Sequence, residues 1–312
     1  MKKVFYILAS LALAACIHDE PLEHNPELAL MFQPSMYMHM SDDSVEYYPN
    51  EQPFAVRAWQ LPRGKQWDEA SGEAVEFLPT TTAYCSEVRI TDTLDTYGVY
   101  DKLWTIDENP VWPSQDETLT FIAYSPAAAA QCTCDPVDGV VHTMDIREEQ
   151  TDFLFSIPCS DRHKIKNGWI VPIIFDHALC RMDLKVSHRV AADEKITVKS
   201  IVIDSVLCKG TFRSLPSPHW TLDDTVTSFA FYEGSKEITS KPTEIGKYLL
   251  LPPQRLATAI TVEYDYTTAM QTTITQKHST VLMGATLRAG QTYTYWLSIG
   301  IDDVKFLHEI IE

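Results

Sequence analysis

Apolar and polar residues alternate with a period of two along much of this chain, which is the pattern of strands that bury one face. In residues 260–266, for example, Ile, Val and two Tyr residues alternate with Thr, Glu and Asp, and residues 182–186 and 293–299 repeat the pattern. Shorter runs of the same kind predict further strands at 28–32, 54–61, 84–90, 118–124, 140–146, 196–204, 248–251 and 272–282.

Turns rich in Pro, Asn, Asp and Gly separate these runs, and no strand–helix alternation is visible. Such a chain is expected to be all-β, built from antiparallel β-sandwiches rather than from a parallel α/β sheet. The polar stretch at residues 160–168 is the predicted boundary between two domains. We therefore expect an N-terminal β-sandwich over residues 28–165 and a C-terminal one over residues 168–312.

The N-terminus has the composition of an export signal. Lys2 and Lys3 precede an apolar run at residues 4–15, which is too short to span a bilayer. Cys16 follows small residues directly, as in bacterial lipoprotein signals, in which this cysteine is acylated. We expect a signal peptide at 1–15, a lipid on Cys16 and an acidic, proline-broken tether at 16–27. The alternative is a soluble secreted protein whose Cys16 only happens to lie near the cleavage site.

The formal charge of −18 argues against nucleic-acid binding, because no basic patch could face phosphates. It also argues against electrostatic attachment to anionic lipid, which leaves the acyl group as the anchor. Six cysteines follow Cys16, and an exported compartment would permit disulfides among them. For Cys180 and Cys208, buried free thiols are an equally good reading.

Motifs of catalysis are missing from the sequence. It contains no Gly-x-Ser-x-Gly elbow, phosphate-binding glycine loop or His-Glu-x-x-His helix, so we expect no enzyme, no metal and no cofactor. His177 is predicted to be a packed or hydrogen-bonded residue rather than a ligand. The acidic doublets at 42–43 and 223–224 are predicted to lie in solvated turns; a hydrolase with paired carboxylates is a distant alternative.

Aromatic residues offer a second hypothesis, a surface glycan-binding lipoprotein. Trp59, Trp220 and Trp296 lie in strand-like contexts and are predicted to pack in the core. The other candidates lie in polar stretches and are the better predictions for exposed contacts with sugars: Trp67, Trp104 and Trp112.

Six segments follow the lipoprotein signal in order, at residues 119–126, 151–155, 174–184, 196–212 (with Trp220 after it), 250–254 and 289–295. Together, and in this order, they resemble the fimbrillin family, the subunits and accessory proteins of type V fimbriae. The resemblance implies two transthyretin-like β-sandwich domains and a role in building fimbriae or in adhesion. It implies neither catalysis nor a cofactor. The implied partners are other fimbrial subunits, the outer membrane through the lipid, and host or glycan receptors.

The family's assembly mechanism adds a question about processing. In shaft subunits an arginine-specific protease removes the first strand, and a neighbour's terminal strand fills the groove by β-strand addition. Here the candidate first strand is 28–32, and residues 17–56 contain neither Arg nor Lys. The first candidate processing sites are Arg57, inside a predicted strand, and Arg63, in the following turn. This favours a member that keeps its first strand and acts as an anchor or accessory component.

The C-terminus can be interpreted in two ways. Val304 and Phe306 keep the alternation, but Ile310 and Ile311 interrupt it. Val304, Phe306 and Ile310 could therefore belong to a donor strand for a neighbouring subunit or to an ordinary closing strand. Together these patterns predict a lipid-anchored, surface-exposed component of fimbriae in the outer membrane.

Overall fold

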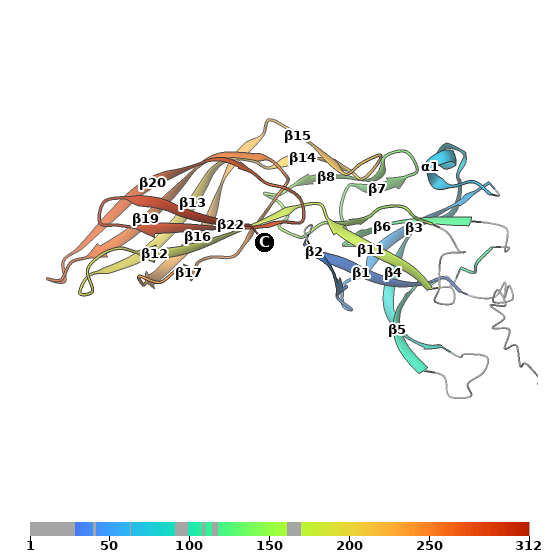
Figure 1. Ribbon diagram of the computed structural model, residues 1–312, viewed down its shortest axis with the longest axis horizontal. Helices are drawn as coiled ribbons and strands as arrows, with labels where there is room; N and C mark the ends of the chain where they lie inside the picture. Colours follow the sequence, from blue (N-terminus) through green and yellow to red (C-terminus); the bar gives the residue numbers. More distant parts are fainter. Residues whose placement is uncertain are drawn as a thin grey trace, which may run out of the picture.

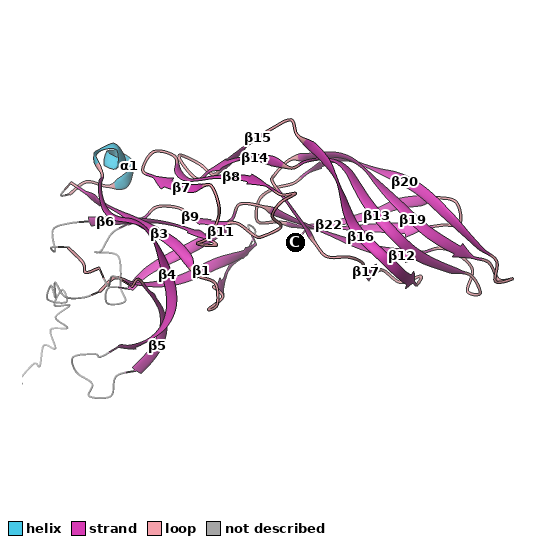
Figure 2. Ribbon diagram, turned by 180° about the vertical axis from the view of Figure 1, so that it is seen from behind, coloured by secondary structure: helices cyan, strands magenta, loops and turns pink. Residues whose placement is uncertain are grey.

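The computed structural model describes residues 29–39, 42–62, 64–90, 99–107, 110–113, 118–160 and 170–311, and nearly all its regular structure is strand (Figures 1 and 2). The signal peptide, Cys16, Arg63 and the boundary stretch at 161–168 lie outside the described residues. The first half holds the short helix α1 (Trp67–Ala70), a 3-10 turn (Ser71–Glu73) and the strands β1 (Met31–His39), β2 (Asp42–Tyr47), β3 (Phe54–Leu61), β4 (Val75–Ile90), β5 (Val99–Thr105), β6 (Thr118–Ser125), β7 (Cys132–Asp135), β8 (Gly139–Asp145), β9 (Leu154–Ser156), β10 (Cys159–Ser160) and β11 (Ile170–His177).

The second half is built from longer hairpins, which extend away from the first half in Figure 1. Its strands are β12 (Cys180–His188), β13 (Lys195–Leu207), β14 (Lys209–Arg213), β15 (His219–Leu222), β16 (Val226–Ile238), β17 (Thr243–Glu244), β18 (Leu249–Leu251), β19 (Arg255–Thr267), β20 (Thr273–Thr286), β21 (Thr292–Ile299) and β22 (Val304–Ile311).

The large sheet of the first half closes on itself. Its strands follow the order β10-β6-β3-β4-β5-β1-β11-β9, and β9 also pairs with β6. That last pairing joins the two ends of the series, so the strands from β6 round to β9 form a ring. β1 completes the ring because it lies between β5 and β11, with β2 folded against its C-terminal part.

A four-stranded sheet, β15-β14-β8-β7, joins the two halves of the sequence. In it, residues 209–213 of β14 pair with residues 141–145 of β8. Strands on both sides of the predicted boundary at 160–168 therefore share one sheet. The division into domains at 28–165 and 168–312 stays a prediction.

The rest of the second half consists of two packed sheets. One contains β12, β17, β18, β21 and β22, and the other has the order β16-β13-β19-β20. The three clearest alternating runs lie here, and their apolar positions are buried as predicted. Ile260, Val262 and Tyr264, for example, are fully buried on β19, while the polar residues between them are partly exposed. The prediction of an all-β sandwich fold is confirmed; the transthyretin-like pattern of the two domains stays a prediction.

Two apolar cores follow from this arrangement. One fills the ring and includes Leu30, Phe32, Phe54 and Phe121. The other is continuous from the outer face of β3 and β6 into the second half. Strand β3 is buried on both faces because it contributes side chains to both cores. Within the described ranges, no helix is long and apolar enough to cross a membrane.

Candidate functional site

The first strand of the protein closes the ring. It was predicted at 28–32, but the structure places β1 at Met31–His39; of the two described residues before it, Ala29 forms a bridge to Val111. Residues 31–36 run parallel to residues 170–175 of β11, whereas the pairing to β5 consists of Phe32 opposite Trp104 alone. One edge of β1 is thus attached along much of the strand, and the ring closes at the other edge through one residue pair.

The side chains of β1 that point inward belong to the core of the ring. Leu30, Phe32 and Pro34 are buried, and Gln33 between them is exposed. The ring of Phe32 makes edge-to-face contacts with Phe54 at 6.1 Å and Phe121 at 5.6 Å between centroids. Removal of this strand would open an apolar groove, because the faces of Phe54 and Phe121 that Phe32 covers would be exposed.

Tyr48, which directly follows β2, packs the chain against the ring of strands. Its ring packs on Phe54 and Phe175, and its hydroxyl lies 2.6 Å from the Oγ of Ser125. Burial raises the pKa of Tyr48 to about 12, so the phenol stays protonated and can serve as the donor in this hydrogen bond. The β1–β2 hairpin is therefore anchored to the ring at both of its ends.

The candidate processing site Arg57 lies in the middle of β3, where it pairs with Ile122 of β6 and falls at an irregularity in the ladder to β4. Its guanidinium donates to the carbonyl of Cys134, forms an ion pair with Glu76 and lies 5.2 Å from the ring of Trp59. A protease needs an extended, unpaired segment, which Arg57 does not offer in the folded chain. The second candidate, Arg63, lies outside the described residues.

The C-terminal strand β22 pairs with β21 of its own chain, antiparallel, and ends the order of its sheet. Val304 is buried, Phe306 packs against Tyr295 at 5.8 Å, and Ile310 is 40% exposed. In the structure β22 thus has the position of a closing strand. A donor role for Val304, Phe306 and Ile310 stays a prediction.

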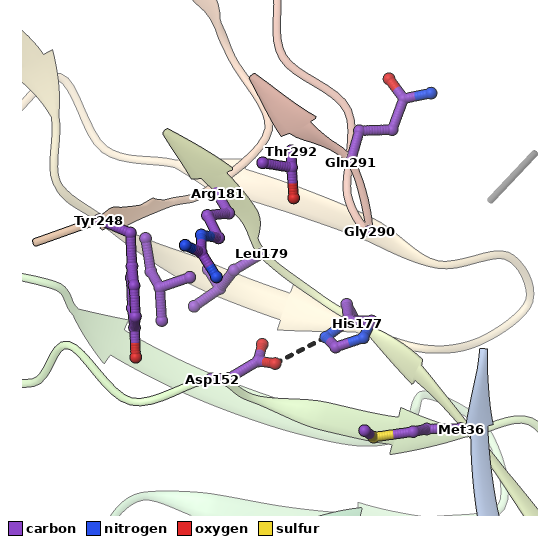
Figure 3. Close-up of a pocket in the computed structure, with 10 residues that line it drawn as sticks. Met36, Asp152, His177, Leu179, Arg181, Tyr248, Gly290, Gln291 and Thr292 are labelled. Atoms are coloured by element: carbon purple, nitrogen blue, oxygen red, sulfur yellow. Dashed lines mark hydrogen bonds and ion pairs between the residues drawn. The ribbon is translucent and has the colours of Figure 1, made fainter. Parts of the chain in front are cut away.

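A pocket of about 300 Å³ lies where the two halves meet. Its lining comes from β1 (Met36), from the segment before β9 (Asp152), from β11 and β12 (His177 and Arg181), and from the loop before β18 (Tyr248). In Figure 3, Asp152 and His177 face one another, and Arg181 lies beside Tyr248.

The charged side chains that line this pocket form hydrogen bonds with neighbouring residues. The Nδ1 of His177 lies 2.6 Å from the Oδ2 of Asp152, which confirms the prediction of a hydrogen-bonded histidine. The guanidinium of Arg181 donates two hydrogen bonds to Asp183 and lies 4.5 Å from the ring of Tyr248. Because Met36 belongs to β1, this pocket is complete only while a strand occupies that position.

A larger cavity, of about 470 Å³, lies at the same junction, and Phe155, Phe212 and Trp220 contribute aromatic rings to its lining. Phe155 and Phe212 form its base, with ring centroids 4.7 Å apart, and Trp220 lies 5.6 Å from Phe212. Asp176, on β11, contributes a half-buried carboxylate. We call this the aromatic cavity. The sequence identified its Trp220 only as a core residue, because the cavity joins strands far apart in the chain.

The tryptophans behave differently from the prediction in three cases. Trp67, Trp104 and Trp112 were expected to be exposed, but all are at most 7% exposed. Polar neighbours in sequence were misleading, because each indole faces inward against other rings or aliphatic groups; Trp67 packs on Trp59 at 5.7 Å, for example. Trp59 is buried as predicted. Trp220 and Trp296 are partly buried, and their indole N–H groups donate to Ala178 and Ser187.

The structure also shows where the predicted cysteines and acidic doublets lie and how exposed they are. Cys180 and Cys208 are buried free thiols, as one of the two readings had it. Burial raises the pKa of Cys134 and Cys180 to about 12, which keeps these thiols neutral. Asp223 and Asp224 are exposed beside β15, as predicted, whereas Asp42 and Asp43 belong to β2 rather than to a turn.

The geometry defines an all-β protein whose first strand closes a ring of strands and whose two halves share a sheet. The sequence matches the fimbrillin-like family over residues 65–310, and the chain belongs to that family. Comparison with curated proteins finds no match.

Several solved structures have a similar fold. A fimbrial protein from Bacteroides vulgatus is similar with a TM-score of 0.61 and 16% identity, over 90% of this chain and 98% of that one. A candidate cell adhesion protein from Bacteroides uniformis has a TM-score of 0.52 and 15% identity, over 93% and 99%. A third, from Bacteroides ovatus, has a TM-score of 0.51 and 15% identity, over 91% and 96%. At these identities the likeness concerns the fold.

Proposed function

We propose that this chain is a structural component of cell-surface fimbriae, anchored in the outer membrane through a lipid on Cys16, that keeps its own first strand. The observation that carries the proposal is the position of β1, which closes the ring and, with Leu30 just before it, places Leu30 and Phe32 in the core of the ring. A sheet that depends on one terminal strand is suited to β-strand addition, since an equivalent strand from a neighbour would repair it.

Two features favour retention of β1 over its removal. No Arg or Lys occurs in residues 17–56, so an arginine-specific protease has no site between β1 and β3. Arg57 is paired within β3, and a cut at Arg63 would remove β3 together with β1 and β2. Loss of β3 would take away a central strand that contributes to both cores, which is far more than an exchangeable terminal strand.

A retained first strand suits an anchor or accessory position. A subunit whose groove stays filled cannot accept a donor strand there, so it would end the row of subunits on that side. Its other contact would be made through β22, whose outer edge pairs with no strand among the residues that the structure describes. Exposed Leu307 and Ile310 on this strand are available for such a contact. The lipid on Cys16 would then hold the end of the fimbria at the membrane.

The N-terminus of the protein in native cells tests the proposal. We expect the surface form to begin at an acylated Cys16 and to retain the segment before Arg57, as measured by intact mass and peptide mapping. A mature N-terminus at Ala58 or Gly64 would contradict retention. The variants Arg57→Gln and Arg63→Gln serve as matched controls, since both should leave the mass of an uncut protein unchanged apart from the substitution.

The anchor and the assembly role are tested separately. Cys16→Ala should release the protein from membrane fractions, and continued retention there would count against the lipid. Filaments sheared from the cells should contain the protein with β1 present. If the purified protein neither copurifies with filaments nor forms heat-sensitive ladders with other subunits, the fimbrial role is wrong.

A further inference from the structure

The aromatic cavity is built by residues that strand pairing brings together from three separate parts of the chain. Asp176 of β11 lies directly opposite Phe155 of β9, and Phe212 of β14 lies opposite Trp220 of β15. The contact between Phe155 and Phe212, at 4.7 Å, connects these two pairs. The result is a continuous row of rings next to a carboxylate.

The rings of the aromatic cavity are fixed in position before any ligand arrives. Phe155 and Phe212 are 2% exposed and form a rigid base. The indole N–H of Trp220 donates a 2.7 Å hydrogen bond to the carbonyl of Ala178, which orients the ring as one wall. A preorganised aromatic wall binds at lower entropic cost than a mobile one.

One polar group of the cavity, the carboxylate of Asp176, is open to a ligand. The carboxylate of Asp176 is half-buried, yet it accepts no hydrogen bond from any residue in the described ranges. Burial raises the pKa of this carboxyl, with the neighbouring His177 acting in the opposite direction. A half-buried acceptor without a donor gains from a ligand that supplies one.

Two further groups at the rim complete the set. His219 donates from Nδ1 to the carbonyl of Ser217 at 2.8 Å, which leaves its Nε2 as an acceptor. The exposed guanidinium of Arg288 supplies donors, and it forms no ion pair with the part of the chain that the structure describes. The cavity therefore presents acceptors and donors around an apolar surface.

Charge decides which ligand fits. A cation would be attracted by Asp176 but repelled by Arg288. An anion would be attracted by Arg288 but repelled by Asp176. A neutral ring with several hydroxyl groups suits both, because hydroxyls donate to Asp176 and His219 and accept from Arg288. The C–H faces of such a ring pack on aromatic side chains, and a volume of about 470 Å³ accommodates one or two sugar units.

We propose that the aromatic cavity, formed by Phe155, Phe212, Trp220, Asp176, His219 and Arg288, is a binding site for a neutral saccharide. The site goes beyond the fimbrial role and does not depend on it. It also differs from the sites that the sequence suggested, since Trp67, Trp104 and Trp112 are buried elsewhere.

Binding by the full-length chain tests the site. The probes are methyl glycosides of glucose, galactose, mannose, fucose and N-acetylglucosamine and their disaccharides, followed by saturation-transfer NMR and calorimetry. We expect saturable binding of at least one sugar, weakened at least tenfold by Asp176→Asn and at least threefold by Arg288→Met. Asp224→Asn, which makes the same change of charge at an exposed turn, should bind like the wild type. Thermal unfolding must show that each variant is folded.

Several outcomes would overturn the proposal. It is wrong if no sugar saturates, if Asp176→Asn and Arg288→Met bind like the wild type, or if choline or acetate binds where the sugars do not. Incorporation into filaments is measured in parallel. Asp176→Asn should assemble normally, so failure of sugar binding and failure of the fimbrial role give different results.

Discussion

Two strand pairs in the described part of the chain are parallel, β1–β11 and β12–β21. Strands β11 and β12 are consecutive in the chain, and the two pairs differ in how β1 and β21, their distant partners, are held. Strand β21 pairs with β12 along residues 292–299 and with β22 along nearly its whole other edge. Strand β1 pairs with β11 along residues 31–36, but its other edge meets β5 only at Phe32 and otherwise faces β2 of its own hairpin. The same parallel geometry thus gives a strand paired along both edges in one half and a strand paired mainly along one edge to the ring in the other.

Among the variants that test this comparison of β1 with β21, a substitution of Phe32 should have the largest effect on stability. Phe32→Ala should lower the free energy of unfolding by about 3–5 kcal/mol, because it leaves a cavity among fully buried rings. Denaturant unfolding measures the loss, and hydrogen exchange should show faster opening of β1 while β21 stays protected. Gln33→Ala, at the exposed neighbour, should cost less than about 0.5 kcal/mol. Equal opening of β1 and β21 in Phe32→Ala would remove the distinction.

The next effect concerns the sheet that links the two regions. Gly139, at the start of β8, has a φ of +69°, and a Cβ there would lie 2.2 Å from the Oγ of Ser214. That hydroxyl accepts a hydrogen bond from the N–H of Val140, so Gly139→Ala should combine backbone strain with a disturbed contact between the halves. We expect a loss of about 2–4 kcal/mol in thermal unfolding.

Gly64→Ala is the matched control for this variant. Gly64 has a similar φ of +74° but open space around it, so only the backbone strain of about 1–2 kcal/mol applies. Equal losses for the two variants would mean that the contact between Gly139 and Ser214 adds nothing to the junction.

A smaller effect depends on pH. His142 of β8 is buried in the same linking sheet, 4.3 Å from the ring of Phe153, and burial lowers the pKa of its imidazole below the ordinary value of 6.5. The unfolded chain then binds the proton more readily than the folded one, so stability should fall as the pH drops through 6.5. Each unit of pKa difference corresponds to about 1.4 kcal/mol.

The variant His142→Phe should lose this part of the pH dependence in unfolding measured between pH 5.5 and 8. His188 of β12 lies in the other region, and burial lowers its pKa as well. Its substitution by Phe should therefore remove a separate contribution of the same sign. An unchanged pH profile in His142→Phe would show that the histidine is not responsible.

The smallest effect is expected on the surface of the second half. Lys195 and Glu237 form an ion pair at 3.2 Å across β13 and β16, but both side chains are more than half exposed. Lys195→Gln should change the free energy of unfolding by less than about 0.5 kcal/mol, and added salt should remove even that difference. A loss above 1 kcal/mol would show that the second half depends on its surface charges more than on its core.

The sequence predicted the second half better than the first, and the strands show why. Residues 260–266 alternate regularly because β19 has one face in the core and one near solvent. Strand β1 was placed too early and too short, since Pro34 and a mixture of Met, Tyr and His obscure its pattern. Strand β3 is buried on both faces, so its alternation says little about which core each residue joins.

Pairing between distant segments could not be read from local patterns. The parallel ladder of β1 and β11 and the ladder of β8 and β14 depend on the three-dimensional path of the chain. The aromatic cavity was missed for the same reason, although Trp220 and Asp176 were visible in the sequence. Burial of Trp67, Trp104 and Trp112 likewise comes from partners remote in sequence, such as Phe121 for Trp112.

The parallel direction of β1 and β11 also determines how the protein would resist mechanical load. The chain enters β1 at one end of the ladder and leaves β11 toward β12 at the other. A pull on the segment ahead of β1, with the second half held, would therefore draw the two strands past one another along their length. The interstrand hydrogen bonds would be stressed together rather than one after another, so the ladder would resist tension along its axis.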